Sequence, residues 1–130
     1  MVKRESENSS ENVCNLRYLS DTMGGKKHLI KEIMDVFLKQ IPEELQAINE
    51  AIAKEDFTII KSFAHTMKSS VSIMGISVLT PVLQEMEDLG GKQESPDNYR
   101  DERIKELNQK LALICKKAMI EIEREKHNYI

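Results

Sequence analysis

Apolar side chains recur every three or four residues along most of this chain, and pairs of adjacent glycines interrupt the pattern. That spacing places the apolar side chains on one face of an α-helix, and no segment shows the alternation typical of a strand. Gly24-Gly25 and Gly90-Gly91 each follow such a pattern, as glycine commonly does where a helix ends. The chain is therefore expected to form amphipathic helices joined by short turns.

The first half of the chain is predicted to contain three short helical segments. Apolar spacing indicates one helix over about 13–23, a second over about 26–40 and a third over about 45–52. Pro42 is expected to break or kink the chain between the last two, because its ring removes a backbone donor and restricts Ile41.

The second half of the chain is predicted to contain three more helices. Asp56 is typical of an N-cap, and Gly75 is expected to end the helix that Asp56 begins. Ser77 or Thr80 is expected to cap the next helix, and a long last helix is predicted over about 98–127. Short connections between amphipathic helices favour an all-α fold, an antiparallel four-helix bundle with an additional short N-terminal helix.

Length and composition limit the classes of protein to which the chain can belong. With 130 residues, we expect one helical domain over residues 12–130, after a polar and disordered tail over residues 1–11. A formal charge of −3 does not favour a nucleic-acid surface. No apolar stretch approaches the ~18 residues of a membrane span, and no apolar run follows the N-terminal charges, so no signal peptide is predicted. Cys14 and Cys115 both lie in helical patterns outside any CxxC motif, which favours a reduced, cytoplasmic compartment.

His65 is the most unusual residue of the helix predicted after Asp56. At 100° per residue it lies opposite the apolar stripe of that helix, on a face with small and cationic side chains. The apolar face comprises Ile60, Phe63, Met67, Val71 and Met74, and the polar face comprises Lys61, Ser62, His65, Lys68, Ser69 and Ser72. An imidazole on that face is displayed to solvent with nothing bulky beside it.

The stretch from Ala64 to Gly75 resembles the phosphoacceptor helix of histidine-containing phosphotransfer (HPt) domains. That family carries a pattern like His-x-x-Lys-Gly-Ser/Ala-Ser/Ala, with a glycine ten residues after the histidine. The matching residues are His65, Lys68, Ser69, Ser70 and Gly75, and the lead-in from Phe37-Leu38 through Pro42-Glu43 is also similar. The likeness covers about residues 13–90, and Ser69 departs from it by replacing the usual glycine.

The resemblance implies a function as well as a four-helix bundle. His65 is expected to accept a phosphoryl group from the aspartyl phosphate of a receiver domain and to pass it to another receiver aspartate in two-component signalling. The implied partners are response-regulator receiver domains and a hybrid histidine kinase. We expect a monomeric phosphocarrier that is not an enzyme, because one imidazole suffices for the chemistry and no glycine-rich loop could bind ATP.

Helix geometry places Glu87 near His65. His65 lies ten residues before Gly75 and Glu87 twelve after it, so both are about 15–18 Å from the turn at ~1.5 Å per residue. The resemblance also places a glutamate or glutamine here. Glu87 is expected to accept a hydrogen bond from Nδ1–H and to leave Nε2 free to attack. Lys68, one turn after His65, is expected to stabilise the phosphoryl oxygens, and Lys61 to add a weaker field.

Other residues on this helix are candidates for partner binding. Ser69 and Ser72 provide clearance for a receiver domain, and Phe57, Ala64 and Ile73 are predicted to form part of a docking rim. No acidic cluster accompanies His65, so we expect no metal or cofactor of its own and Mg²⁺ in the acidic site of the partner receiver.

Two other classes of protein are alternatives to this interpretation. An enzyme is disfavoured, because a histidine kinase needs a nucleotide-binding domain and a di-metal bundle needs Glu-x-x-His repeats on facing helices. A helical adaptor that binds a signalling partner without phosphorylation stays open, and in that case His65 would be incidental.

Overall fold

The computed structural model describes residues 12–92 and 98–129, and every regular element in them is helical. The elements are α2 (Leu16–Thr22), α3 (Lys27–Ala53), α4 (Phe57–Ile73), α5 (Leu79–Gly90), α6 (Tyr99–Glu125) and the 3₁₀ helix η1 (Lys126–Tyr129). The tail expected over residues 1–11 lies outside the described residues. The all-α prediction is confirmed.

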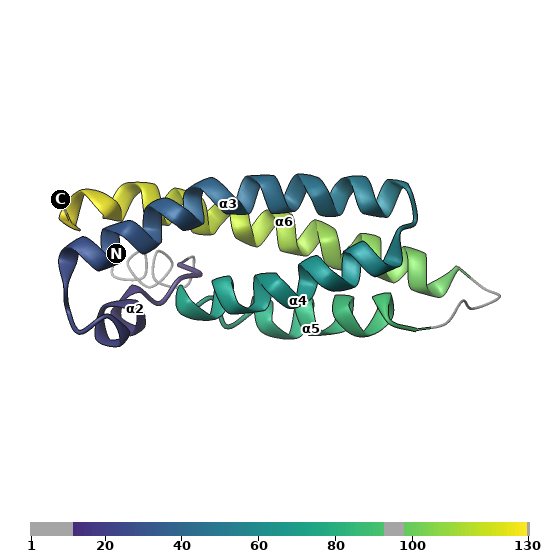
Figure 1. Cartoon of the computed structure of the whole chain (residues 1–130), viewed down its shortest axis with the longest axis horizontal. Helices are drawn as coiled ribbons and strands as arrows, with labels where there is room; N and C mark the ends of the chain where they lie inside the picture. Colours follow the sequence, from purple (N-terminus) through teal and green to yellow (C-terminus); the bar gives the residue numbers. More distant parts are fainter. Residues whose placement is uncertain (1–11, 93–97, 130) are drawn as a thin grey trace, which may run out of the picture.

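Four helices form an antiparallel bundle, and the short α2 packs across one end of it (Figure 1). The two long helices α3 and α6 lie side by side, and the hairpin of α4 and α5 covers them. One continuous core fills the space between the helices, and its fully buried side chains are mostly aliphatic residues and methionines. They include Ile30, Met34, Ile41, Ile48, Ile60, Met67, Leu83, Met86, Leu111 and Ile122. The bundle with an extra N-terminal helix is therefore as predicted.

The predicted break at Pro42 is wrong, because α3 runs without interruption from Lys27 to Ala53. Pro42 lies on the exposed side of α3. Water can there hydrogen-bond the helix carbonyl group that would otherwise accept from an N–H at position 42. Its neighbours Ile41 and Ile48 are completely buried on the inner face. Burying each such side chain contributes about 1.5–3 kcal/mol, which offsets the cost of about 3 kcal/mol for an interior proline.

Local signals set the start of α4 as expected but not the start of α5. The Asp56 side chain accepts from the Ile59 amide at 3.3 Å and caps α4, as predicted. The predicted cap of α5 by Ser77 or Thr80 is wrong, because Val78 holds the N-cap position and no side chain caps this helix. Backbone bonds in the preceding turn, among them Leu79 N–H to Ile76 O at 3.0 Å, take that role.

The segment before α2 is extended and ties the N-terminal side of the domain to the bundle. It includes Cys14, so the helical pattern predicted for this cysteine is also wrong. The backbone amides of Val13 and Cys14 donate to the buried carboxylate of Glu121 in α6. The Asn15 amide donates to Met74 O at 3.0 Å, at the C-terminal end of α4. This segment therefore joins α6 to the tip of the α4–α5 hairpin.

Gly75 makes that tip possible and yields a test of the fold. Its φ is 69°, and a Cβ built on it would lie 2.5 Å from the Cβ of Asn15. We expect Gly75→Ala to lower the free energy of unfolding by about 3 kcal/mol, from the left-handed backbone and the clash together. Urea denaturation followed by circular dichroism measures the difference.

Gly24→Ala is the matched control, because Gly24 has a similar φ of 67° and open space around it. It should cost only about 1 kcal/mol, the backbone contribution alone. Equal losses in the two variants would contradict the proposed contact between Gly75 and Asn15.

Candidate functional site

His65 projects from the outer face of α4, and 70% of its side chain is exposed. The core side of the same helix is formed by Ile60, Met67 and Val71, all fully buried, so the amphipathic pattern fixes the imidazole on the outside. The sequence-based placement of His65 on a solvent-facing surface is therefore confirmed.

Glu87 of α5 reaches this imidazole, as the count of residues from Gly75 predicts. The His65 Nδ1 lies 2.9 Å from Glu87 Oε2. Because an ionised carboxylate can only accept, this contact assigns the proton to Nδ1 and leaves the Nε2 lone pair free in the neutral ring.

The close approach of the two helices depends on a small residue. A Cβ on Gly90 would lie 3.0 Å from both the Lys61 Cβ and the Phe57 carbonyl oxygen of α4. Glycine at this position allows the end of α5 to pack against the backbone of α4, which keeps Glu87 within reach of His65.

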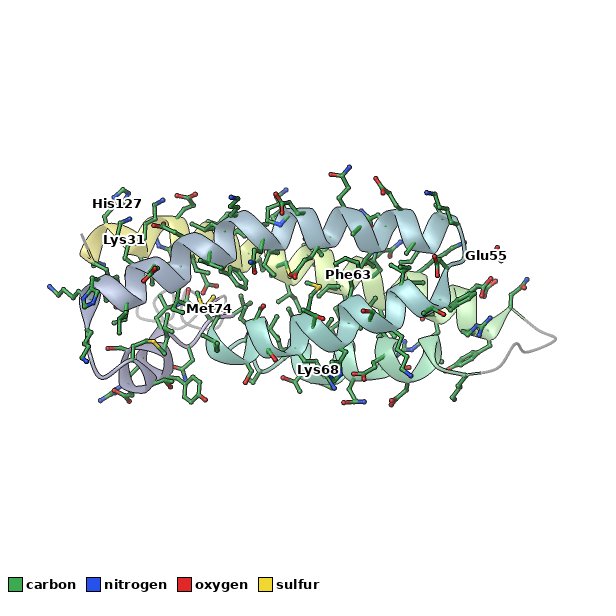
Figure 2. All side chains as sticks on the ribbon, viewed as in Figure 1. Lys31, Glu55, Phe63, Lys68, Met74 and His127 are labelled. Atoms are coloured by element: carbon green, nitrogen blue, oxygen red, sulfur yellow. The ribbon has the colours of Figure 1, made fainter. Side chains whose placement is uncertain are left out.

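Lys68 lies on the side of α4 along which α5 runs (Figure 2). Its ammonium is 2.7 Å from Glu87 Oε1 and donates to Gln84 Oε1 at 2.8 Å. One carboxylate therefore contacts the imidazole with one oxygen and the ammonium with the other. The ammonium of Lys68 is the main reason that the pKa of Glu87 lies below its usual range, and the bond from His65 contributes further.

Gln84 is a member of the site that sequence reasoning missed. Besides accepting from Lys68, it donates to Asp88 Oδ1 at 3.0 Å, so the cluster extends over three residues of α5. Its position three residues before Glu87 puts it on the same face of α5, and this spacing was the available signal.

The predicted docking residues divide between the two sides of His65. Lys61, Ser69 and Ser72 are exposed, as expected of a surface that a partner could approach. Ile73 is partly exposed and lines an apolar hollow of about 320 Å³ between α3 and α4, together with Val36.

The docking role predicted for Ala64 does not agree with the structure, and that of Phe57 stays a prediction. Ala64 is completely buried, because it faces α5 between Lys61 and Lys68. The Phe57 ring is only partly exposed, and the Arg100 guanidinium of α6 stacks over it at 3.6 Å from the ring centroid. Neighbouring helices therefore cover this side of α4, and the accessible apolar surface lies on the side of α3.

Neither a metal-binding cluster nor a membrane-spanning helix occurs among the described residues. Within residues 12–92 and 98–129, no group of three or more His, Cys, Asp or Glu side chains could hold a metal ion. None of the helices in those ranges combines the length and hydropathy that crossing a bilayer requires.

The shared carboxylate predicts a measurable titration. Lys68→Ala should raise the pKa of Glu87 towards its ordinary value, because the largest influence on it is removed. Carboxyl ¹³C NMR titration of Glu87 measures this shift. Lys61→Ala is the matched control, since Lys61 is not among the groups that shift the pKa of Glu87. A Glu87 pKa that is unchanged in Lys68→Ala would contradict the ion pair.

Comparisons with known proteins agree with this geometry. The family model for the Hpt domain matches residues 32–117, a range that includes His65, Lys68 and Glu87. No curated protein sequence gives a match. The crystal structure of histidine-containing phosphotransfer protein B (HptB) from Pseudomonas aeruginosa PAO1 matches with a TM-score of 0.76. That match covers 91% of this chain and 97% of the HptB chain at 20% identity, so it establishes a shared fold. With two thirds of its length matched by the family model, this chain belongs to the Hpt domain family of histidine phosphotransfer proteins.

Proposed function

We propose that His65 is the phosphoacceptor of this protein, which carries a phosphoryl group between receiver aspartates in a phosphorelay. The observation that supports this proposal is the exposed imidazole whose Nδ1 is paired with Glu87. The pairing fixes one tautomer and directs the free lone pair of Nε2 outward, where an aspartyl phosphate can approach.

The covalent bonds made and broken in the transfer step involve only the imidazole and the incoming aspartyl phosphate. The lone pair of Nε2 forms a bond to phosphorus while the bond from phosphorus to the aspartyl oxygen breaks, and that oxygen keeps the electron pair as a carboxylate. Nδ1 retains its proton, so the phosphorylated ring is cationic. Glu87, 2.9 Å away, balances that charge. The reverse sequence returns the group to a second receiver aspartate.

Lys68 supplies the cation for the phosphoryl oxygens. Its ammonium carries three donors and is bound through Glu87 on the face of α4 that bears His65. A phosphoryl group on Nε2 adds negative charge close to this ammonium, and their attraction favours the transferred state. Lys61, also exposed, contributes a weaker, longer-range field.

The proposed partners are response-regulator receiver domains and a hybrid histidine kinase. A receiver would approach over the small side chains of Ser69 and Ser72 and bury apolar surface in the hollow beside Ile73. Mg²⁺ would come with the acidic site of the receiver. We propose that the protein works as a cytoplasmic monomer with no ATP-binding site of its own.

Replacement of the phosphoacceptor provides the direct test. Incubation with each phosphorylated receiver domain encoded in the same genome should yield acid-labile, base-stable label on His65 of the wild type. His65→Gln should take up no label and keep the helical circular dichroism spectrum, because residue 65 is exposed. His28→Gln, an exposed histidine of α3, should label normally. Normal labelling of His65→Gln would contradict the assignment, and no label on wild type would favour an adaptor.

Removal of the Lys68 ammonium tests its proposed role in stabilising the phosphoryl oxygens. Lys68→Ala should slow transfer roughly tenfold, equivalent to about 1.4 kcal/mol of transition-state stabilisation. Binding of the unphosphorylated receiver should stay within about twofold, since the ammonium acts on the phosphoryl oxygens. Rapid-quench labelling measures the rate and calorimetry the affinity. An unchanged transfer rate would remove Lys68 from the mechanism.

A further inference from the structure

Gln84 is a polar residue of the site that the transfer step does not use. Its side-chain amide is held from both sides, since Nε2 donates to Asp88 Oδ1 at 3.0 Å and Oε1 accepts from Lys68 Nζ at 2.8 Å. The Asp88 carboxylate can only accept and Lys68 can only donate, so the two contacts fix which way the amide points. Gln84 therefore presents a neutral oxygen to the ammonium.

In the resting protein Lys68 is held by two side chains of α5. Its ammonium is bound on the α5 side by an ion pair with Glu87 Oε1 at 2.7 Å and a hydrogen bond to Gln84 Oε1 at 2.8 Å, and only 24% of its side chain is exposed. Glu87 contacts His65 at Nδ1, whereas the phosphoryl group is accepted at Nε2. The carboxylate that holds the resting ammonium is thus the one that contacts Nδ1 and not Nε2.

We propose that Gln84 is a positioning residue that acts as the exchangeable ligand of Lys68. It holds the ammonium while His65 is unphosphorylated and yields it to a phosphoryl oxygen when His65 carries the group. This role rests on the proposed function of His65. No bond other than the hydrogen bond from Lys68 to Gln84 is broken in the exchange.

The charges of the two ligands decide which one Lys68 releases. Glu87 is an anion that also stays bound to Nδ1–H after phosphorylation, so its contact with the ammonium persists. Gln84 offers a neutral oxygen, whereas Glu87 and a phosphoryl oxygen are anionic, so the Coulomb attraction of the ammonium for either of them is stronger. A phosphoryl oxygen therefore displaces Gln84 more readily than Glu87. A carboxylate at position 84 would hold Lys68 against that exchange.

Gln84→Glu tests the exchange with a nearly isosteric side chain. We expect the rate of His65 labelling by phosphoramidate, a small donor that needs no docking surface, to fall about tenfold. Because the new charge could also repel the donor directly, the same substitution is made in Lys68→Ala. There it should slow labelling by less than about twofold, since no ammonium is left to retain. An equal slowing in both backgrounds would overturn the proposal.

Gln84→Met provides a spectroscopic test that a merely structural role would not satisfy. Methionine has a similar size but lacks the amide oxygen, so the ¹⁵Nζ signal of Lys68 should differ from wild type in the unphosphorylated protein. After phosphorylation the two proteins should give the same Lys68 signal, because Gln84 is no longer a ligand. A difference that persists unchanged would overturn the exchange.

The two proposals fail in distinguishable ways. If wild type takes no label on His65 from either phosphoramidate or a phosphorylated receiver, the proposed function fails and the role of Gln84 falls with it. If wild type is labelled on His65 but Gln84→Glu acts independently of Lys68, only the role of Gln84 is lost.

Discussion

The carboxylate of Glu87 is the interaction on which the site depends, because its two oxygens hold two different side chains of α4. One contacts the imidazole of His65 at 2.9 Å and the other the ammonium of Lys68 at 2.7 Å. Without the carboxylate, the imidazole could exchange tautomers and the ammonium would have only a neutral ligand. A single anion on a neighbouring helix therefore sets both the tautomer of the imidazole and the position of the ammonium.

That arrangement requires α4 and α5 to keep one register and one separation. Gly75 and Asn15 fix the tip of the hairpin, and Gly90 lets its other end close against α4. The extended segment before α2 strengthens the tip through Glu121 of α6. Burial, together with the carboxylate of Glu121, raises the pKa of the Cys14 thiol far above its usual range, and burial raises the pKa of Cys115 to about 12. Both thiols stay protonated and act as packing residues.

Features that depend on local spacing could be predicted from the sequence. The Asp56 cap and the C-terminal ends of α4 and α5 follow from local residue signals, and the contact of Glu87 with His65 follows from helix periodicity and rise. Pro42 could not be placed, because the sequence does not give the burial that keeps α3 intact around it. Local pattern also gave no reason to separate Ala64 from its exposed neighbours.

One side of α4 is covered by α5 and by Arg100 of α6, which limits the directions from which a partner can approach His65. Packing of α5 buries Ala64, and Arg100 covers Phe57, so the α5 side of His65 is occupied by the polar cluster of Gln84, Glu87 and Asp88. The opposite side, towards α3, keeps small side chains and the apolar hollow open. A partner that closed over the imidazole from the α3 side would leave the cluster intact, so that the ligand exchange proposed for Lys68 could take place there.

A neutral, exchangeable ligand of Lys68 would also suit the proposed carrier, because the phosphoryl group must be released again. A carrier that bound the phosphoryl group with a wholly unpaired lysine would stabilise the phosphorylated state more and slow its discharge, because only differential stabilisation of the transition state accelerates transfer. In the proposed exchange Gln84 offsets part of that gain, since Lys68 gives up an existing hydrogen bond as it contacts the phosphoryl oxygens. The exchange would thereby keep the ammonium available in both directions, as the proposed reversible transfer between two aspartates requires.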